Sequence, residues 1–161
     1  GAYILMSFLK NVQAHCDIPC KIYDPAIAQI ATLTVIRLLD LIAEEKGNEY
    51  SLESEAKIAR LVLEKEEQAA IVKNEINIIW GDYFKEPQIE MCPSIHTLVH
   101  SLMQAGSKCK QELDPENGAK LLDLVNKFAS MFWETKAVST RLVVAPYPPA
   151  LGFIQPVLPD V

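Results

Sequence analysis

The chain has 161 residues, of which 50% are hydrophobic, and a formal net charge of −6 at pH 7. A domain of this size can bury a substantial core, and an acidic chain without a basic stripe argues against a nucleic-acid partner. The sequence holds no uninterrupted run of about 20 apolar residues, so we expect no membrane segment, and its four cysteines do not describe a disulfide framework.

We interpret residues 1–14 as a leader. Apolar side chains gather between Ile4 and Leu9, but no basic region precedes them, so a secretory signal is poorly supported. The chain starts with Gly1, and Met6 could be the natural start. An ordinary N-terminal arm is the alternative interpretation of this segment.

The next stretch concentrates metal-binding side chains. His15, Cys16 and Cys20 place an imidazole and two thiols within six residues, and Pro19 lies in the turn between the thiols. This soft donor set suits zinc, copper, nickel or iron, and it falls short of the four protein ligands of a structural zinc site. A cut after Ala14 would free the amine of the histidine. That amine, the amide nitrogen of the first cysteine and both thiolates would form a planar set, which points to Ni(II) or Cu(II).

Two long helices are predicted next. The first spans 24–47, with Asp24 as N-cap, Pro25 at the first helical position and Gly47 as the stop. Its expected core face is Ile27, Ala31, Val35, Leu38 and Ile42, and its expected solvent face is Gln29, Arg37, Asp40 and Glu44. The surplus apolar residues Ile30, Leu33, Ile36 and Leu41 predict contacts with other subunits. The second helix, 51–81, begins at the N-cap Ser51, and its core face is Ile58, Val62, Ala69, Val72, Ile76 and Ile79.

A turn over 82–87 precedes two further predicted helices. The third begins near Cys92 and Pro93, ends at Gly106 and buries Ile95, Leu98, Val99, Leu102 and Met103. The fourth opens at Asp114 and buries Leu121, Val125, Phe128 and Phe132. Because no window alternates with period two strongly enough to claim a strand, the prediction for 15–136 is an all-α, up-down-up-down four-helix bundle.

The last segment, 137–161, has a different composition. It holds five of the ten prolines and only two charged residues, Arg141 and Asp160. We expect an extended Pro-rich tail rather than a helix. Its apolar content indicates that it packs on something, and the sequence leaves open whether this is its own bundle or a neighbouring chain.

Three motifs, in register along the chain, carry a resemblance to a known family. They are His15-Cys16-Asp17-Ile18-Pro19-Cys20 with Tyr23-Asp24-Pro25 behind it, Trp80-Gly81-Asp82-Tyr83-Phe84-Lys85, and Phe132-Trp133-Glu134-Thr135-Lys136. From about residue 15 to residue 136 the chain resembles the nickel-containing superoxide dismutases. That family has the pattern His-Cys-x-x-Pro-Cys-Gly-x-Tyr-Asp-Pro at its mature N-terminus.

The resemblance implies an antioxidant oxidoreductase that disproportionates superoxide to dioxygen and hydrogen peroxide at a Ni(II)/Ni(III) centre. Residues 15–23 would form the metal hook, with His15, Cys16 and Cys20 as the nickel ligands and Tyr23 ordering water or superoxide beside them. These four residues are the candidate catalytic residues. The resemblance also implies that a peptidase removes the leader as a propeptide, that the uncut chain is inactive, and that the enzyme is a homo-oligomer, a hexamer by the family rule.

Three positions depart from the family pattern. Lys21 stands where the pattern has glycine, so the exit of the hook must either avoid a positive φ or carry strain. Ala31 and Gln68 stand where some members have a Glu and an Arg behind the metal site. We therefore expect His15 to be held less firmly, which would affect the rate rather than the identity of the reaction.

The remaining candidate residues have structural interpretations. His96 and His100 are four residues apart on a predicted helix, and we interpret them as a solvated pair rather than a metal site. We interpret Cys92 and Cys109 as free thiols, Trp80 and Trp133 as core aromatics, and Lys85 as a solvated lysine, with attraction of superoxide as its alternative role.

Two functions of other classes stay open at this point. One is a copper-binding relative, since copper exceeds nickel in raw affinity. The other is a non-enzymatic helical bundle with a reversible disulfide between Cys16 and Cys20. Thiols beside a histidine indicate metal or redox chemistry in a reducing compartment, so we expect a cytoplasmic location, with an organelle as the alternative.

Overall fold

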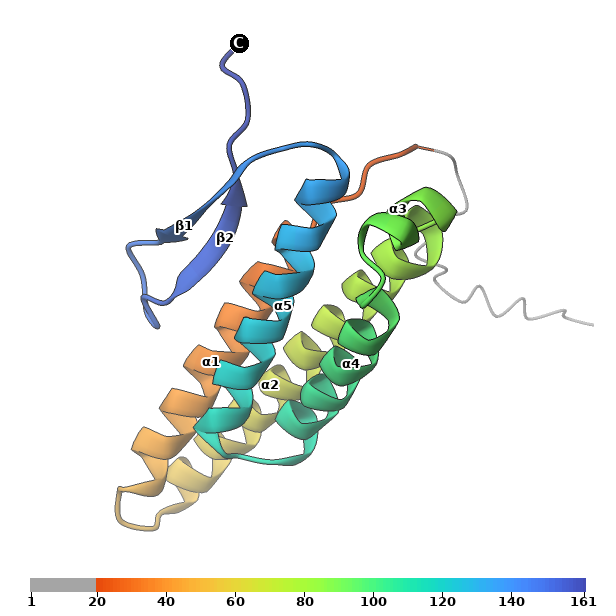
Figure 1. The fold of residues 1–161 in the computed structure, drawn as a ribbon. Coiled ribbons are helices and arrows are strands. Elements are labelled where there is room, and N and C mark those ends of the chain that lie inside the picture. The colour runs from red at the N-terminus through yellow and green to blue at the C-terminus, as the bar shows by residue number, and fades with distance from the viewer. Residues whose placement is uncertain (1–19) are drawn as a thin grey trace, which may run out of the picture.

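The computed structural model describes residues 20–161. Its four long helices are α1 (Ala26–Lys46), α2 (Leu52–Ile78), α4 (Ile95–Gln111) and α5 (Pro115–Thr135). A π-helical turn, η1 (Ile79–Tyr83), and the short helix α3 (Glu86–Met91) join α2 to α4, and the strands β1 (Thr140–Val144) and β2 (Gly152–Pro156) follow α5. Figure 1 shows the long helices running alternately down and up, which confirms the predicted helical bundle.

Side-chain caps begin the helices close to the predicted positions. The Asp24 carboxylate accepts a hydrogen bond from the backbone N–H of Ala26 at 2.8 Å, although Ala26 itself is the first helical residue. The hydroxyl of Ser51 accepts from the N–H of Ser54 at 3.0 Å, and the carboxylate of Asp114 caps α5 in the same way. Each cap satisfies a donor that the first turn leaves without a partner.

The connection between α2 and α4 differs from the prediction. Gly106 does not end α4, which continues to Gln111. A Cβ at position 106 would lie 2.8 Å from Cγ of Lys73 on α2, so the glycine permits a close approach of two helices instead of ending one. The predicted turn is likewise occupied by η1 and α3, with Pro87 in the first turn of α3, where its missing N–H has no cost.

The α1 surface also departs from the sequence prediction. Ile27 is 52% exposed, whereas Gln29, assigned to the solvent face, is 3% exposed. Leu33 and Ile36, assigned to contacts with other subunits, are buried within this chain. Ile30 remains exposed. Two of the four surplus residues of α1 are therefore covered by the chain's own C-terminal segment and α5.

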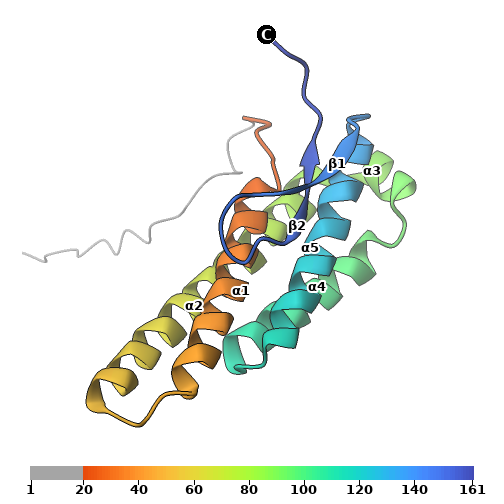
Figure 2. The ribbon, with the colours of Figure 1, turned by 90° about the vertical axis from the view of Figure 1, so that its left-hand side faces the viewer.

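The tail forms an antiparallel β-hairpin, in place of the strandless segment that the sequence predicted. Phe153 packs against Leu33 and Ile36 on α1 and against Leu122 on α5. The side-chain amide of Asn126 donates to the carbonyl of Gly152 and accepts from the N–H of Ile154, both at 3.0 Å, and Gln29 donates to the carbonyl of Ile154 at 2.6 Å. Figure 2 shows the hairpin lying over α1 and α5. The tail thus packs on its own bundle.

Helix α1 is the most apolar of the four long helices. By length and hydropathy alone it meets a criterion for a membrane span, contrary to the sequence expectation, since its best window has a mean hydropathy of 1.8. However, 56% of that window is buried inside the structure. A core helix that contacts α2, α5 and the hairpin has the same composition, and the packing accounts for it.

Lys65 is a fully buried lysine on α2. Its ammonium donates to the backbone carbonyls of Cys109 and Lys110, the latter at 2.7 Å. Both carbonyls belong to the last turn of α4, where they have no partner within the helix. Burial lowers the pKa of the Lys65 ammonium. The side chain thus joins α2 to the end of α4.

Lys65→Met is expected to lower the free energy of unfolding by ~2–4 kcal/mol, because it leaves two buried carbonyls without a donor. Urea unfolding followed by circular dichroism measures the change. The control is Lys120→Met on α5, which removes an exposed lysine and is expected to change stability by less than about 0.5 kcal/mol. Equal stability of the two variants would contradict the assigned role.

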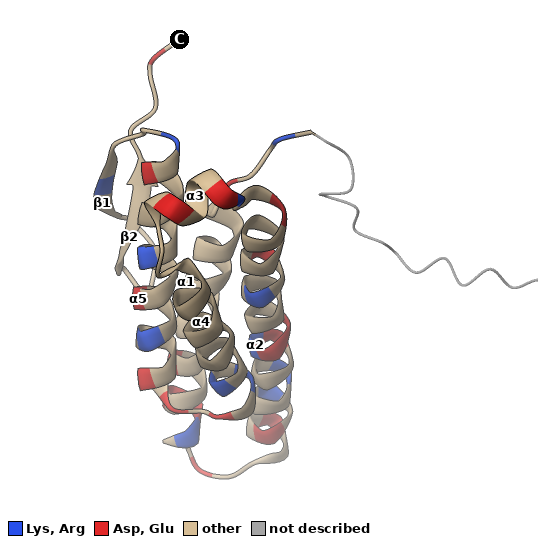
Figure 3. Ribbon diagram, turned by 45° about the vertical axis from the view of Figure 1, so that its right-hand side comes forward, with Lys and Arg blue, Asp and Glu red and all other residues tan. Residues whose placement is uncertain are grey.

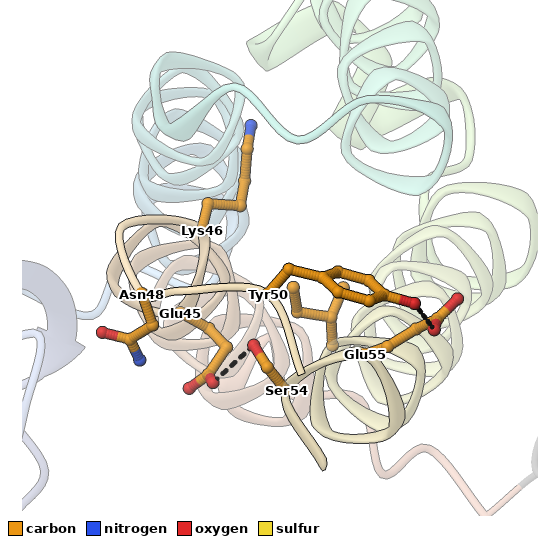
Figure 4. A pocket seen from close by; sticks show the side chains of 7 residues that line it. Glu45, Lys46, Asn48, Tyr50, Ser54 and Glu55 are labelled. Atoms are coloured by element: carbon orange, nitrogen blue, oxygen red, sulfur yellow. Dashed lines mark hydrogen bonds between the residues drawn. The ribbon is translucent and has the colours of Figure 1, made fainter. Parts of the chain in front are cut away.

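A shallow pocket lies in the α1–α2 turn, at the far end of the bundle (Figure 4). The Glu45 carboxylate there accepts hydrogen bonds from Lys57 Nζ at 2.6 Å and from Ser54 Oγ at 2.8 Å. These hydrogen bonds hold the pKa of Glu45 below its ordinary value, and the bond from Lys57 has the largest effect. The deprotonated carboxylate thus ties the two helices together.

Because the folded-state pKa of Glu45 is lowered, its contribution to stability is present at neutral pH and is lost as the pH falls below about 4.5. Glu45→Gln is expected to lower stability at pH 7 and to make stability less dependent on pH in the acid range. Thermal unfolding between pH 3 and pH 7 measures this, with the exposed Glu49→Gln as control. Parallel pH profiles for Glu45→Gln and the unmodified chain would refute it.

Candidate metal centre

The chain enters the bundle at the end where η1, α3 and the C-terminus of α5 meet (Figure 1). Of the four predicted site residues, Cys20 and Tyr23 lie here, immediately before α1. Cys20 is exposed and Tyr23 is half-buried. His15 and Cys16 lie outside the described residues. The structure therefore positions the exit of the hook and one of its thiols.

The three sequence motifs meet at this end through aromatic rings. The ring of Tyr23, from the first motif, lies 5.7 Å from that of Tyr83 in the second motif, measured between centroids. The Tyr83 ring lies 4.9 Å from Phe132 in the third motif. Motifs that are far apart in the sequence thus form one contiguous cluster behind the hook.

A chain of hydrogen bonds fixes the orientation of Tyr83. The Thr135 hydroxyl donates to the carbonyl of Phe132 at 2.6 Å, and the same hydroxyl oxygen lies 2.7 Å from the Tyr83 hydroxyl. Because the single Thr135 proton is used on the carbonyl, the Tyr83 hydroxyl is the donor in the second bond. Tyr83 and Thr135 had no role predicted from the sequence, although their place inside two of the motifs was the signal that could have identified them.

Exposed side chains of both charge signs lie at this end of the chain. Lys136 Nζ lies 4.7 Å from the centroid of the Tyr83 ring, a cation–π contact. Lys21 and Lys85 are both exposed. Figure 3 shows basic residues on the segment entering α1 and at the end of α5. Acidic side chains, among them Asp24, Glu86 and Glu134, are exposed at the same end, so the lysines lie among carboxylates.

The backbone at Lys21 has a φ of 59°, in the left-handed region. Of the two outcomes expected for a lysine at the family's glycine position, the structure shows the positive φ. This conformation costs a non-glycine residue roughly 1–2 kcal/mol. The hook exit of this chain therefore takes a left-handed turn at a lysine.

Positions 31 and 68, where some family members have a Glu and an Arg behind the metal site, hold neutral side chains in this chain. Ala31 is 2% exposed in the core, and the amide of Gln68 donates to the Glu64 carboxylate at 2.9 Å on the same helix. Neither side chain brings a charge to the hook end. The prediction that His15 is held less firmly concerns a residue outside the described range, so it stays a prediction.

The other candidate residues have structural roles. Nδ1 of His96 accepts a hydrogen bond from Nε1 of Trp80 at 3.0 Å, so this histidine is exposed but paired with a residue of the second motif. Cys92 and Cys109 are buried free thiols, as predicted. Burial raises the pKa of both and brings that of Cys109 to about 11, so that it stays protonated at neutral pH. Within residues 20–161, no group of three or more His, Cys, Asp or Glu could hold a metal ion.

The hook donor set fits nickel. The accessible Cys20 thiol at the hook exit, the Cys16 thiol and the nitrogen donors of His15 combine soft sulfur with strong nitrogen ligands on one short segment. Such a set suits a late first-row metal in a planar or square-pyramidal geometry. It does not suit calcium or magnesium, which take oxygen ligands.

The comparisons with known proteins point the same way. The family model for nickel-containing superoxide dismutases matches residues 10–136. The nickel superoxide dismutases of Streptomyces seoulensis and Streptomyces coelicolor are 37% and 36% identical to this chain over 126 residues, which is 78% of this chain and 91% of each relative. A native nickel superoxide dismutase structure has a TM-score of 0.67 at 37% identity, covering 76% of this chain and 99% of the solved chain. A second structure, with nickel ligation corresponding to the oxidized state, has a TM-score of 0.68 at 36% identity, with the same coverage. The chain belongs to the family of nickel-containing superoxide dismutases.

Proposed function

We propose that the nickel superoxide dismutase activity of this chain is located in the hook 15–23, with His15, Cys16 and Cys20 as the ligands. One observation carries the proposal: the ring contact between Tyr23 and Tyr83 holds the exit of the hook against the place where the three family motifs meet. The sulfur and nitrogen donors that suit nickel are on the same segment. The hook therefore carries the candidate ligands, and its exit is held against the bundle by the contact between Tyr23 and Tyr83.

The chain's own residues perform the remaining tasks of the reaction. Nickel bound in the hook supplies one-electron chemistry by alternating between Ni(II) and Ni(III). Two superoxide anions and two protons give dioxygen and hydrogen peroxide, so protons must be delivered near the hook. The Tyr23 hydroxyl orders water or superoxide there, and the Tyr83 ring, held by Thr135, limits the movement of Tyr23. Lys21, Lys85 and Lys136 are the cations at this end that we assign to attracting the anionic substrate, against the exposed carboxylates among them.

We also propose that a peptidase removes residues 1–14, and that the mature enzyme is a cytoplasmic homo-oligomer, a hexamer by family resemblance. The apolar surplus of α1 gives this assembly little support, because Leu33 and Ile36 are buried within the chain. Other apolar side chains are exposed on the tail, among them Leu142 and Val144. These now support the proposed assembly.

The test uses a chain whose first residue is His15, produced by cleavage of a fusion protein and loaded with either nickel or copper. We expect one nickel per chain and rapid decay of superoxide, followed by stopped-flow absorbance, for the nickel form only. The matched control is His15→Ala prepared in the same way, which loses the imidazole and is expected to be much slower. Equal activity of the copper form, or none with bound nickel, would overturn the proposal.

A further inference from the structure

Helix α4 begins with a histidine that contacts the second motif. The indole Nε1–H of Trp80 donates a hydrogen bond to Nδ1 of His96 at 3.0 Å, and the two rings meet edge to face with their centroids 5.8 Å apart. Because Nδ1 accepts this bond, the proton of the neutral imidazole is on Nε2. The histidine is exposed, so protons from solvent can reach it. The bond therefore exists only while this ring is neutral.

Trp80 belongs to η1, a turn that depends on support from outside itself. A backbone bond of the wide π type runs from the N–H of Phe84 to the carbonyl of Ile79 at 3.3 Å, and such turns are rare. Gly81 lies between Trp80 and Tyr83, and a glycine loses more conformational freedom on ordering than any other residue. Even a Cβ at this position would meet nothing within 4 Å. The side chains on either side of the glycine must therefore hold the turn.

These two side chains are tied to different helices. Trp80 is tied to α4 through His96, and Tyr83 is tied to α5 through Thr135, whose hydroxyl oxygen lies 2.7 Å from the Tyr83 hydroxyl. The Tyr83 ring in turn contacts the ring of Tyr23, with 5.7 Å between centroids. Loss of either tie leaves η1 held on one side only, with the glycine between the two anchors free to change conformation.

We propose that His96 is a positioning residue for the hook. It acts through Trp80 and η1 on Tyr83, and the Tyr83 ring limits the movement of Tyr23 beside the candidate ligands. The inference rests on the proposed function, to which it adds a support on α4. A protonated imidazole carries N–H groups on both nitrogens and cannot accept from the indole. The support is therefore present at neutral and alkaline pH and is lost in acid.

Other titratable groups lie on the elements around His96. Apart from tyrosines they are Glu75 on α2, Asp82 on η1, Lys85 before α3, Glu86 and Glu90 on α3, Cys92 before α4, His100 on α4 and Glu134 on α5. Within residues 20–161, none of these groups forms a hydrogen bond or an ion pair with His96, which bonds to Trp80. His100 is exposed on the same helix and has no hydrogen bond to that indole, so it provides the matched control.

The first measurement follows the indole N–H signals of the full chain without nickel by two-dimensional NMR. Nε1 of Trp133 is buried and has no acceptor in the described part of the chain. Between pH 8 and pH 5, which spans the titration of an ordinary imidazole, we expect the Trp80 signal to move and the Trp133 signal to stay. In His96→Asn the amide oxygen accepts in place of Nδ1 without titrating, so the Trp80 signal is expected to stay as well. His100→Asn is expected to behave like the unmodified chain.

The second measurement is the contact between the rings of Tyr23 and Tyr83, followed as a nuclear Overhauser effect in the same samples. His96→Ala removes the acceptor and is expected to weaken this effect at pH 8, whereas His96→Asn keeps it. In chains that begin at His15 and carry nickel, His96→Ala is expected to lose roughly 2- to 10-fold in superoxide turnover, the effect of one ordinary hydrogen bond. Turnover of the unmodified chain is expected to fall more steeply towards pH 5 than that of His96→Asn.

Far-UV circular dichroism establishes that each variant is folded. A Trp80 signal that titrates equally in the unmodified chain and in His96→Asn overturns the inference, and so does a ring contact that His96→Ala leaves unchanged. Equal turnover of His96→Ala and an active unmodified chain also overturns it. An unmodified chain that binds nickel without turnover overturns the proposed function instead, and the two NMR measurements then decide whether His96 holds Tyr83 against Tyr23.

Discussion

Replacement of either hook thiol, in Cys16→Ser or Cys20→Ser, is expected to abolish nickel binding and superoxide turnover while the helical content stays unchanged. A serine hydroxyl is a hard donor that remains protonated at neutral pH, so it cannot replace a thiolate as a soft, electron-rich ligand. Nickel per chain is measured by mass spectrometry, activity by superoxide decay, and helicity by far-UV circular dichroism.

Cys109→Ser provides the matched control for the thiol substitutions. Its thiol is 0% exposed in the core, so this variant is expected to lose stability and to keep its nickel. Cys20, by contrast, is exposed ahead of α1 and adds little to the packing of the bundle. If Cys20→Ser retains most of its nickel and activity, the thiolate assignment is wrong. If it loses helical signal instead, the hook has a structural role.

The uncut chain, which still carries residues 1–14, is expected to have no activity above that of free nickel. Its His15 nitrogen is part of a peptide bond, and such a nitrogen, in resonance with its carbonyl, can bind a metal only after losing its proton, whereas a free amine offers its lone pair directly. One of the proposed nickel ligands is therefore missing until the bond after Ala14 is cut. Release of the amine is expected to raise activity from background to its full value.

A chain with a specific protease site replacing the residues just before His15 allows this comparison within one preparation. Superoxide decay and nickel content are measured before and after cleavage. A second preparation, cut so that Ala14 remains attached to His15, controls for removal of the leader itself. Full turnover by a nickel-loaded chain that retains Ala14 would show that the free amine of His15 is not required.

Local sequence chemistry was sufficient to predict the bundle. Ser51 and Asp114 cap helices as expected, because a side-chain oxygen next to an unpaired N–H acts within a single turn. The helical spacing of Leu121, Val125 and Phe128 placed all three in the core, where each is 0% exposed. These features depend on neighbours three or four residues away, which a single sequence displays.

The errors arose from contacts between distant segments. Gln29 is buried because it donates to the carbonyl of Ile154, more than 100 residues later, and a helical pattern contains no sign of that partner. Leu142 and Val144 did not indicate a strand, because residues 142–144 are all apolar and no polar residue alternates with them. The prediction that Gly106 ends a helix was wrong, because the glycine is there to leave room for the side chain of Lys73.

The sequence proposed the ligands of the candidate site but not the contacts that support it. His15 and Cys16 lie outside the described residues, so their assignment as hook ligands stays a prediction. The support for Tyr23 was not evident, because the contact with Tyr83 joins two segments that the bundle brings together. The pairing of Trp80 with His96 depends in the same way on how η1 lies against α4.

The left-handed Lys21 has a consequence for the entropy of the hook before it binds metal. A lysine samples less backbone space than a glycine, so ordering the hook from an open state loses less conformational freedom, by about 0.4–1 kcal/mol. This gain offsets part of the roughly 1–2 kcal/mol that the positive φ costs in the ordered state. The net cost of having lysine here is therefore small, and the position can gain a cation beside the metal ligands with little loss of folding free energy.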